Sequence, residues 1–161
     1  MSAPKPLPAG WPRISSAVFY DDASSAIDWL CRAFGFVVRL KVEGEAGRIE
    51  HSELAFLDGL IMVSEAGGKS SRPVPLPCKS PRSLGGANTQ ALLVQVDDVD
   101  AHCAKARTVG ARILDEPATH DYGEQYWSDR IYRAEDLEGH HWWFTQRVRD
   151  PKPGGADSAA G

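Results

Sequence analysis

Apolar and polar positions follow the same order of predicted elements in two stretches of this chain. In the first stretch, residues 14–20 form a strand-like run that ends in Asp21-Asp22. A helix is predicted next, with Asp22 as its N-cap and Gly35 as its stop. Three strands should follow over residues 36–42, 49–57 and 60–64, the last two joined by the turn Asp58-Gly59. The helix is indicated by an apolar stripe at the spacing i, i+3, i+4, i+7, made of Ile27, Leu30, Cys31 and Phe34.

The second stretch repeats this order. A strand over residues 91–96 ends in Asp97-Asp98, and a helix with Val99, Cys103 and Ala106 on one face is closed by Gly110. Strands are predicted over residues 111–114, 130–134 and 141–145. A strand, two aspartates and a helix are a common local motif, but five elements in the same order favour a true repeat. We therefore predict an α+β fold of two tandem βαβββ modules.

Breaker-rich segments delimit the modules. We expect one domain over residues 13–146, with modules at 13–66 and 89–146 joined by a loop at 67–88. The ends, residues 1–12 and 147–161, are rich in Pro, Gly and small residues and are expected to be disordered tails.

The composition argues against several classes of protein. The formal net charge of −4 argues against a mainly electrostatic nucleic-acid binder. The sequence has neither an apolar run long enough to span a membrane nor an apolar stretch near Met1 that could serve as a signal peptide, so we expect a cytoplasmic protein without a membrane partner. The three cysteines are far apart and form no C-x-x-C pair, which argues against a disulfide framework or a zinc knuckle.

Two modules with these landmarks resemble the vicinal oxygen chelate superfamily of glyoxalase I, bleomycin-resistance proteins and extradiol dioxygenases. The resemblance extends from Ile14 to Gln146. Within this superfamily, the sequence is most similar to the glyoxalase-like branch first noticed beside phosphonate-utilisation genes. That branch usually has Asp-Pro where this chain has Asp136-Leu137. The resemblance implies a curved mixed sheet with a ligand on its concave face and helices on its convex face. It also implies a homodimer, in which modules pair within or between chains. The stretches that carry it are His51-Ser52-Glu53-Leu54, 58–65, 96–101, Asp129-Arg130-Ile131-Tyr132 and 136–142.

The resemblance also implies four metal-ligand positions. Aligned on the Asp-Asp and Gly landmarks, they fall at Ser15, Val63, Ala91 and Trp143, none of which is a workable ligand for zinc, iron, nickel or manganese. A two-residue shift on the last strands would instead turn Glu65 and His141 toward the cavity, where His51 and Glu53 could complete a displaced cluster. We favour polar residues that line a wet pocket, and thus no metal and no cofactor.

The concave face should offer a small-molecule pocket. If Ser15 and Ala91 face the cavity, alternation turns Phe19, Leu93 and Gln95 to the same side. Residues 120–127 are predicted to form an aromatic-rich loop at the mouth. Internal packing of Trp127 and Tyr132 and an internal ion pair of Arg130 are the alternative. The expected ligand-binding residues are Phe19, Gln95, Trp127, Arg130, Tyr132, His141 and Trp143.

These features favour a metal-independent protein that sequesters a small aromatic or anionic molecule. The alternatives are a metal-dependent lyase or dioxygenase with displaced ligands, and a metal-free isomerase or hydrolase in which His51, Glu53 or His141 is the general acid or base. A scaffold or regulatory protein with a vestigial pocket is a third class.

Overall fold

The computed structural model describes residues 5–67 and 77–152. The chain divides into two compact units, one up to Gly86 and one from Ala87 onward. The predicted tails and central loop fall partly on residues 1–4, 68–76 and 153–161, which lie outside the described residues. Within the described ranges, no helix is both long and apolar enough to cross a membrane.

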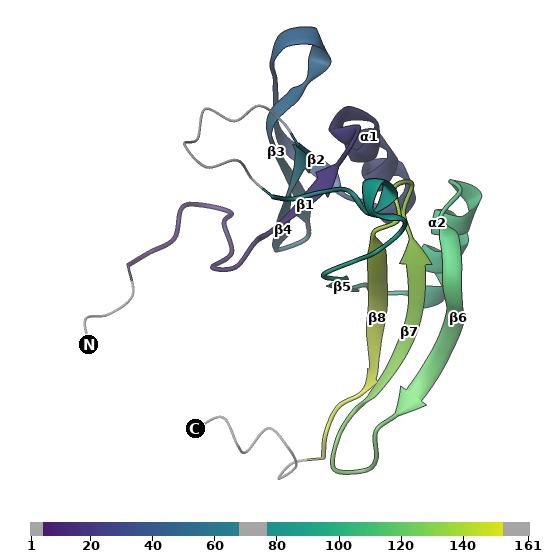
Figure 1. The fold of residues 1–161 in the computed structure, drawn as a ribbon. Helices are drawn as coiled ribbons and strands as arrows, with labels where there is room; N and C mark the ends of the chain where they lie inside the picture. Colours follow the sequence, from purple (N-terminus) through teal and green to yellow (C-terminus); the bar gives the residue numbers. More distant parts are fainter. Residues whose placement is uncertain (1–4, 68–76, 153–161) are drawn as a thin grey trace. The chain divides into compact units, whose positions relative to one another are not determined.

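The first unit is a βαβββ module with a four-stranded mixed sheet (Figure 1). The strand order is β1-β4-β3-β2, with β1 parallel to β4 and the other pairs antiparallel. A short 3₁₀ turn, η1 (Glu45–Gly47), lies between β2 and β3, and a second, η2 (Pro81–Leu84), follows β4. The elements are β1 (Ser16–Tyr20), α1 (Ala23–Phe34), β2 (Val37–Glu43), β3 (Ile49–Phe56) and β4 (Gly59–Glu65).

The helix α1 forms where the apolar stripe predicts it. The Asp22 carboxylate accepts a hydrogen bond from the Ser25 backbone N–H at 3.0 Å, which caps the first turn. Gly35 adopts φ +82°, a left-handed conformation that ends the helix at little steric cost. The stripe buries Ile27, Leu30 and Phe34, while Val18, Tyr20 and Val63 are buried on the sheet. The opposite face of this sheet is called the first open face below.

The second unit repeats the module with strand order β5-β8-β7-β6. Strands β5 and β8 are parallel, and β8, β7 and β6 are antiparallel. The helix packs against one face of the sheet, where Tyr132, Ala134, Trp142 and Phe144 are fully buried. The other side is called the second open face. The elements are β5 (Leu92–Gln95), α2 (Val99–Thr108), β6 (Arg112–Asp121), β7 (Ser128–Glu135) and β8 (His141–Arg149).

The repeat and the fold class are confirmed, but strands β4, β6, β7 and β8 are longer than predicted. Strand β6 continues to Asp121, so His120 and Asp121 belong to a strand and not to the predicted loop. Its register shifts between Asp115 and Ala118, around Pro117, and as an edge strand it tolerates a residue without an N–H donor. Strand β8 continues through Arg149, three residues into the range predicted as a tail.

Candidate functional site

Trp143 forms the centre of the second open face. This residue is 37% exposed, although its neighbours Trp142 and Phe144 are fully buried beneath α2. The β7–β8 register places Arg133 opposite Trp143, and the guanidinium carbon lies 5.4 Å from the centre of the indole ring. Arg133 Nε donates to the Asp115 carboxylate at 2.7 Å. The result is a stacked Trp143–Arg133 pair whose arginine is oriented by a carboxylate.

A second set of the same composition lies further along the same sheet. Arg147 on β8 lies with its guanidinium carbon 5.3 Å from the centre of the Trp127 ring. Its Nε donates to Asp129 at 2.6 Å, and this hydrogen bond raises the pKa of Arg147. Trp127 directly precedes β7, and Tyr122 and Tyr126 pack around it at ring-centroid distances of 5.7 and 6.2 Å. Three aromatic rings of the predicted 120–127 segment, Tyr122, Tyr126 and Trp127, therefore pack together.

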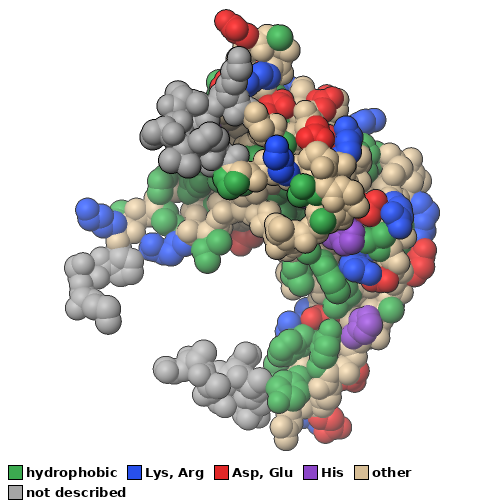
Figure 2. Space-filling model, viewed as in Figure 1, with side chains coloured by type: hydrophobic (Ala, Val, Ile, Leu, Met, Phe, Trp, Pro, Cys, Tyr) green, Lys and Arg blue, Asp and Glu red, His purple; other side chains and the backbone are tan. Residues whose placement is uncertain are grey.

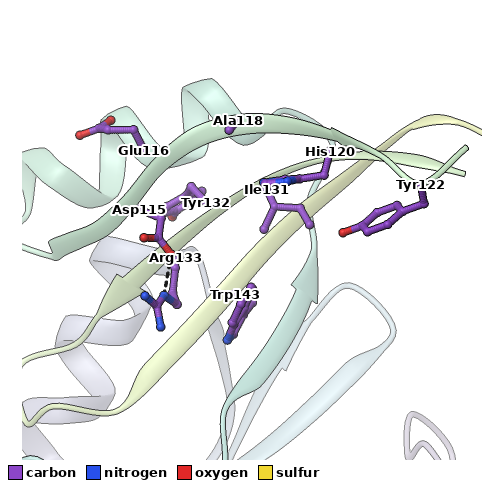
Figure 3. Close-up of a pocket in the computed structure, with 9 residues that line it drawn as sticks. All are labelled: Asp115, Glu116, Ala118, His120, Tyr122, Ile131, Tyr132, Arg133 and Trp143. Atoms are coloured by element: carbon purple, nitrogen blue, oxygen red, sulfur yellow. Dashed lines mark hydrogen bonds and ion pairs between the residues drawn. The ribbon is translucent and has the colours of Figure 1, made fainter.

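A hollow of about 440 Å³ lies on this part of the second unit. Figure 3 shows Ile131, Arg133 and Trp143 on one side of the strands, with Tyr122 toward the end of β6 and the Asp115–Arg133 ion pair beside them. In the space-filling view of Figure 2, hydrophobic side chains gather over the second unit around β8, with cationic and histidine side chains nearby. The hollow is lined by Asp115, Glu116, Ala118, His120, Tyr122, Ile131, Tyr132, Arg133 and Trp143.

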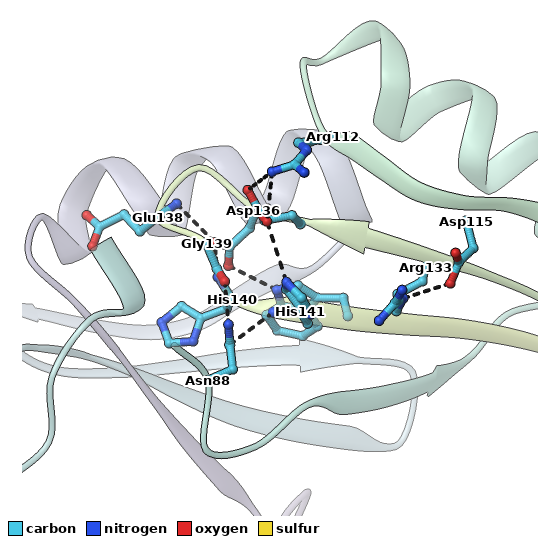
Figure 4. Close-up of polar contacts among 11 residues, drawn as sticks. Asn88, Arg112, Asp115, Arg133, Asp136, Glu138, Gly139, His140 and His141 are labelled. Carbon is cyan, nitrogen blue, oxygen red and sulfur yellow. Dashed lines mark hydrogen bonds and ion pairs between the residues drawn. The ribbon is translucent and has the colours of Figure 1, made fainter. Parts of the chain in front are cut away.

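Two residues before Trp143, His141 lies next to the charged side chains of Glu135 and Arg112. His141 Nε2 is 3.4 Å from a Glu135 carboxylate oxygen, and Arg112 contacts the same carboxylate at 3.2 and 3.3 Å. The backbone N–H of His141 donates to Asn88 at 3.3 Å (Figure 4). The structure gives His141 Nδ1 no hydrogen-bond partner among the residues that it describes. The imidazole thus lies beside a carboxylate, and its Nδ1 has no partner within the described residues.

Gln95 and Thr145 form the row next to Trp143. They are register partners on β5 and β8, and Ile131 of β7 pairs with Thr145 from the other side. Gln95 is exposed on the second open face, as predicted. Thr145 is buried, and its hydroxyl oxygen has no hydrogen-bond partner within the described residues.

Two of the predicted ligand-binding residues, Arg130 and Tyr132, face α2 instead of the second open face. Arg130 donates two hydrogen bonds, of 2.6 and 2.7 Å, to Asp100 on α2, and this contact lowers the pKa of Asp100. The Tyr132 hydroxyl lies 2.7 Å from His102 Nδ1 on α2, and burial raises the pKa of Tyr132. Both side chains therefore point toward the helix, because alternation along β7 assigns Arg130 and Tyr132 to one face and Ile131 and Arg133 to the other. The internal ion pair considered for Arg130 is the arrangement found.

Arg133 and Arg147 are the site residues that the sequence reasoning missed. A signal for Arg133 was available, since Trp143 was already assigned to the open face. The short turn that joins the last two strands places Arg133 opposite Trp143, so both side chains must share a face. No comparable signal existed for Arg147, which falls in the range predicted as a tail.

The first open face carries the other predicted polar residues. Phe19 lies on this face of β1, opposite to the buried Val18 and Tyr20. On β3, His51 Nε2 is 3.1 Å from Glu53, so the predicted pair is in contact. Glu53 is buried and also lies 3.4 Å from Arg39 Nε.

The predicted orientation of Val63 on β4 is wrong, and the alternative considered for Glu65 is not found either. Val63 is fully buried and pairs with Val18, so it faces α1 and not the open face. Glu65 pairs with Tyr20, which faces α1, and its carboxylate oxygen is 3.5 Å from the Ile49 backbone N–H. The alignment on the Asp-Asp and Gly landmarks was one residue out of register on β4. Because side chains of a strand alternate between the two faces of the sheet, this error assigned them to the opposite face.

The metal implied by the resemblance does not fit these residues. On the open-face side of β1 and β4 the structure has Ala17, Phe19, Met62 and Ser64, none with an imidazole, carboxylate or thiolate. Ser15 and Ala91 directly precede β1 and β5, and in the second unit His141 is the one such donor on the open-face side of β5 and β8. Across residues 5–67 and 77–152, no three His, Cys, Asp or Glu side chains are grouped so that they could hold a metal ion.

Comparisons with known proteins agree with this architecture. An uncharacterized Mycobacterium bovis protein, Mb0911c, is 35% identical over 144 residues, which cover 86% of each chain. An uncharacterized Mycobacterium tuberculosis protein, Rv0887c, is also 35% identical and is covered over 76% of its length.

Solved structures give the same result. TioX from Micromonospora sp. ML1 is 30% identical, with a TM-score of 0.65 over 86% of this chain and all of that one. A glyoxalase/bleomycin resistance protein/dioxygenase from Nocardioides shares the fold at 15% identity, with a TM-score of 0.60 over 89% of both chains. The family model of the Glyoxalase/Bleomycin resistance protein/Dioxygenase superfamily matches residues 13–144, and the chain belongs to this superfamily.

Proposed function

We propose that this protein binds a small planar molecule with an anionic group on the second open face, without a metal. The observation that carries the proposal is the exposed indole of Trp143, stacked at 5.4 Å with the guanidinium of Arg133. Such a surface offers an aromatic platform and a fixed cation side by side.

The arginine is prepared to bind an anion. Asp115 engages Arg133 through Nε, and the structure shows no hydrogen bond from its two terminal nitrogens to any described residue. A ligand carboxylate or phosphate could accept from these nitrogens while the Asp115 contact remains. Asp115 is 57% exposed in its side chain, so solvent screens its competing charge.

The lining of the hollow supports a small molecule as the ligand. Ile131, Ala118 and Trp143 supply apolar surface, and Gln95 and His141 lie at neighbouring strand positions. A volume of about 440 Å³ falls within the range of small-molecule sites, which is roughly 300–1,000 Å³. Sequestration of the ligand requires only this affinity and no catalytic pair.

The remaining expectations are part of the same proposal. A kinship with the branch found beside phosphonate-utilisation genes is compatible with an arginine on the binding face. A homodimer and a cytoplasmic location are proposed from the resemblance and from the sequence alone. The alternative function is catalysis, with His141, which lies beside Glu135, as the general acid or base.

The test is a titration with 2-naphthoate, a planar aromatic carboxylate, followed by tryptophan fluorescence. We expect Trp143→Ala and Arg133→Gln each to weaken binding about tenfold, which corresponds to roughly 1.4 kcal/mol. Arg130→Gln is the matched control, because Arg130 lies on the same strand but faces α2. Unchanged affinity in both test variants, or no binding by the wild type, would contradict the proposal.

The charge requirement has its own comparison. Naphthalene-2-carboxamide keeps the ring system and replaces the carboxylate by a neutral amide. The wild type should bind the amide more weakly than 2-naphthoate, and Arg133→Gln should lose this preference. Equal affinities of the wild type for both compounds would show that Arg133 does not recognise the anion.

A further inference from the structure

His141, Glu135 and Arg133 form an arrangement that binding alone does not require. On β8, His141 and Trp143 are two residues apart and face the same side, about 6.6 Å along the strand. On β7, Glu135 lies opposite His141 and Arg133 lies opposite Trp143. An oriented imidazole, a free guanidinium edge and an aromatic platform therefore occupy adjacent positions of one sheet.

We propose that His141 is a general base that abstracts a proton from the carbon next to the carbonyl of a bound aryl-substituted 2-oxo acid. The inference rests on the proposed function, because Trp143 and Arg133 would hold the aryl and carboxylate groups. Glu135, itself held by Arg112, contacts His141 Nε2 and leaves Nδ1 as the nitrogen that accepts the proton. A carboxylate next to a histidine is a common feature of general-base sites, and Glu135 lies 3.4 Å from His141 Nε2.

The step is balanced within the site. His141 Nδ1 takes a proton from C3 of the oxo acid, and the C–H electron pair forms a C2–C3 double bond. The carbonyl π electrons move to oxygen, and the resulting enolate is stabilised by the guanidinium of Arg133. Return of a proton from His141 to C3 restores the oxo acid and the neutral imidazole. No oxidant, reductant or metal takes part.

The test uses 2-oxo-4-phenylbutanoate in D₂O, with deuterium incorporation at C3 followed by NMR. The wild type should accelerate the exchange about 100-fold over buffer, within the usual range for general acid–base catalysis. His141→Gln should lose the acceleration but keep the affinity for the oxo acid, measured by tryptophan fluorescence. Wild type treated with EDTA should exchange as fast as untreated protein.

Two further variants test whether Glu135 positions His141 for the exchange reaction. Glu135→Gln should lower the exchange rate about tenfold without a change in affinity, because Glu135 contacts His141 and Arg112, neither of which holds the aryl or carboxylate group of the ligand. Arg130→Gln, which changes a β7 residue that faces α2, should exchange like the wild type. Wild type that binds the oxo acid but does not accelerate exchange would overturn this inference and leave the proposed function standing. Exchange that survives in His141→Gln, or that EDTA abolishes, would also overturn it, and an absence of binding would contradict the proposed function as well.

Discussion

The Asp136 carboxylate accepts a hydrogen bond from Trp142 Nε1 at 2.9 Å in the turn that joins β7 and β8. Its other oxygen accepts from the backbone N–H groups of Glu138 and His140, both at 3.0 Å (Figure 4). Trp142 is fully buried and adjoins Trp143, so this one carboxylate sets both the turn and the position of the strand that carries the platform of the candidate site.

We expect Asp136→Asn to destabilise the protein by about 2–3 kcal/mol, since the amide loses charge and cannot accept on both sides. Urea unfolding measures this change. Asp150→Asn is the control, because Asp150 is 83% exposed in its side chain and should have almost no effect. Equal stabilities of the two variants would show that the turn does not depend on the Asp136 carboxylate.

Tyr132 should contribute to stability and not to ligand binding. Tyr132→Phe removes the hydroxyl that contacts His102 at 2.7 Å, and we expect a loss of about 1–2 kcal/mol in unfolding free energy. The affinity for 2-naphthoate should stay at the wild-type value, because the ring faces α2. A weakened affinity for 2-naphthoate without a loss of stability would instead show that Tyr132 contacts the ligand, as the sequence predicts.

The order of the elements could be predicted from the sequence because each depends on local signals. The stripe of Ile27, Leu30 and Phe34, the Asp22 cap and the Gly35 stop all specify the first helix, and the structure contains each of them. Strand β6 could not be read in full, because Pro117 and the charged residues near it interrupt the apolar pattern of an edge strand that is held by pairing with β7.

The facing of side chains in the site was harder to predict than the elements. Trp143 and Gln95 were assigned to the correct face because buried neighbours fix their phase. Val63 and Arg130 were assigned to the wrong face, since a shift of one residue in a strand reverses every side chain. The partners that settle the question, Val18 for Val63 and Asp100 for Arg130, are distant in the sequence.

Arg39 should hold the N-terminal segment against the first open face. Its two terminal nitrogens donate to the carbonyl oxygens of Gly10 at 2.6 Å and Ala9 at 2.8 Å, and the guanidinium lies 5.8 Å from the Trp11 ring centre. With 5-fluorotryptophan labelling, Arg39→Gln should shift and sharpen the ¹⁹F resonance of Trp11, because the ring gains freedom of motion. Arg48→Gln, which removes only a 3.5 Å contact with Glu50, should leave that resonance unchanged. An unchanged Trp11 resonance in Arg39→Gln would show that other contacts hold the segment.

The loop that carries Trp127 should loosen in acid through Asp121. The backbone N–H of Gly123 and the guanidinium of Arg149 both bind the Asp121 carboxylate and lower its pKa in the folded protein. A lowered folded-state pKa means that the contribution is complete above the unfolded value of about 3.9 and is lost as the pH falls through the folded value. The ¹⁹F resonance of labelled Trp127 should therefore change below about pH 4 in the wild type. In Asp121→Asn this transition should be absent, because the amide does not titrate, and a transition that persists in the variant would assign the acid sensitivity to another carboxylate.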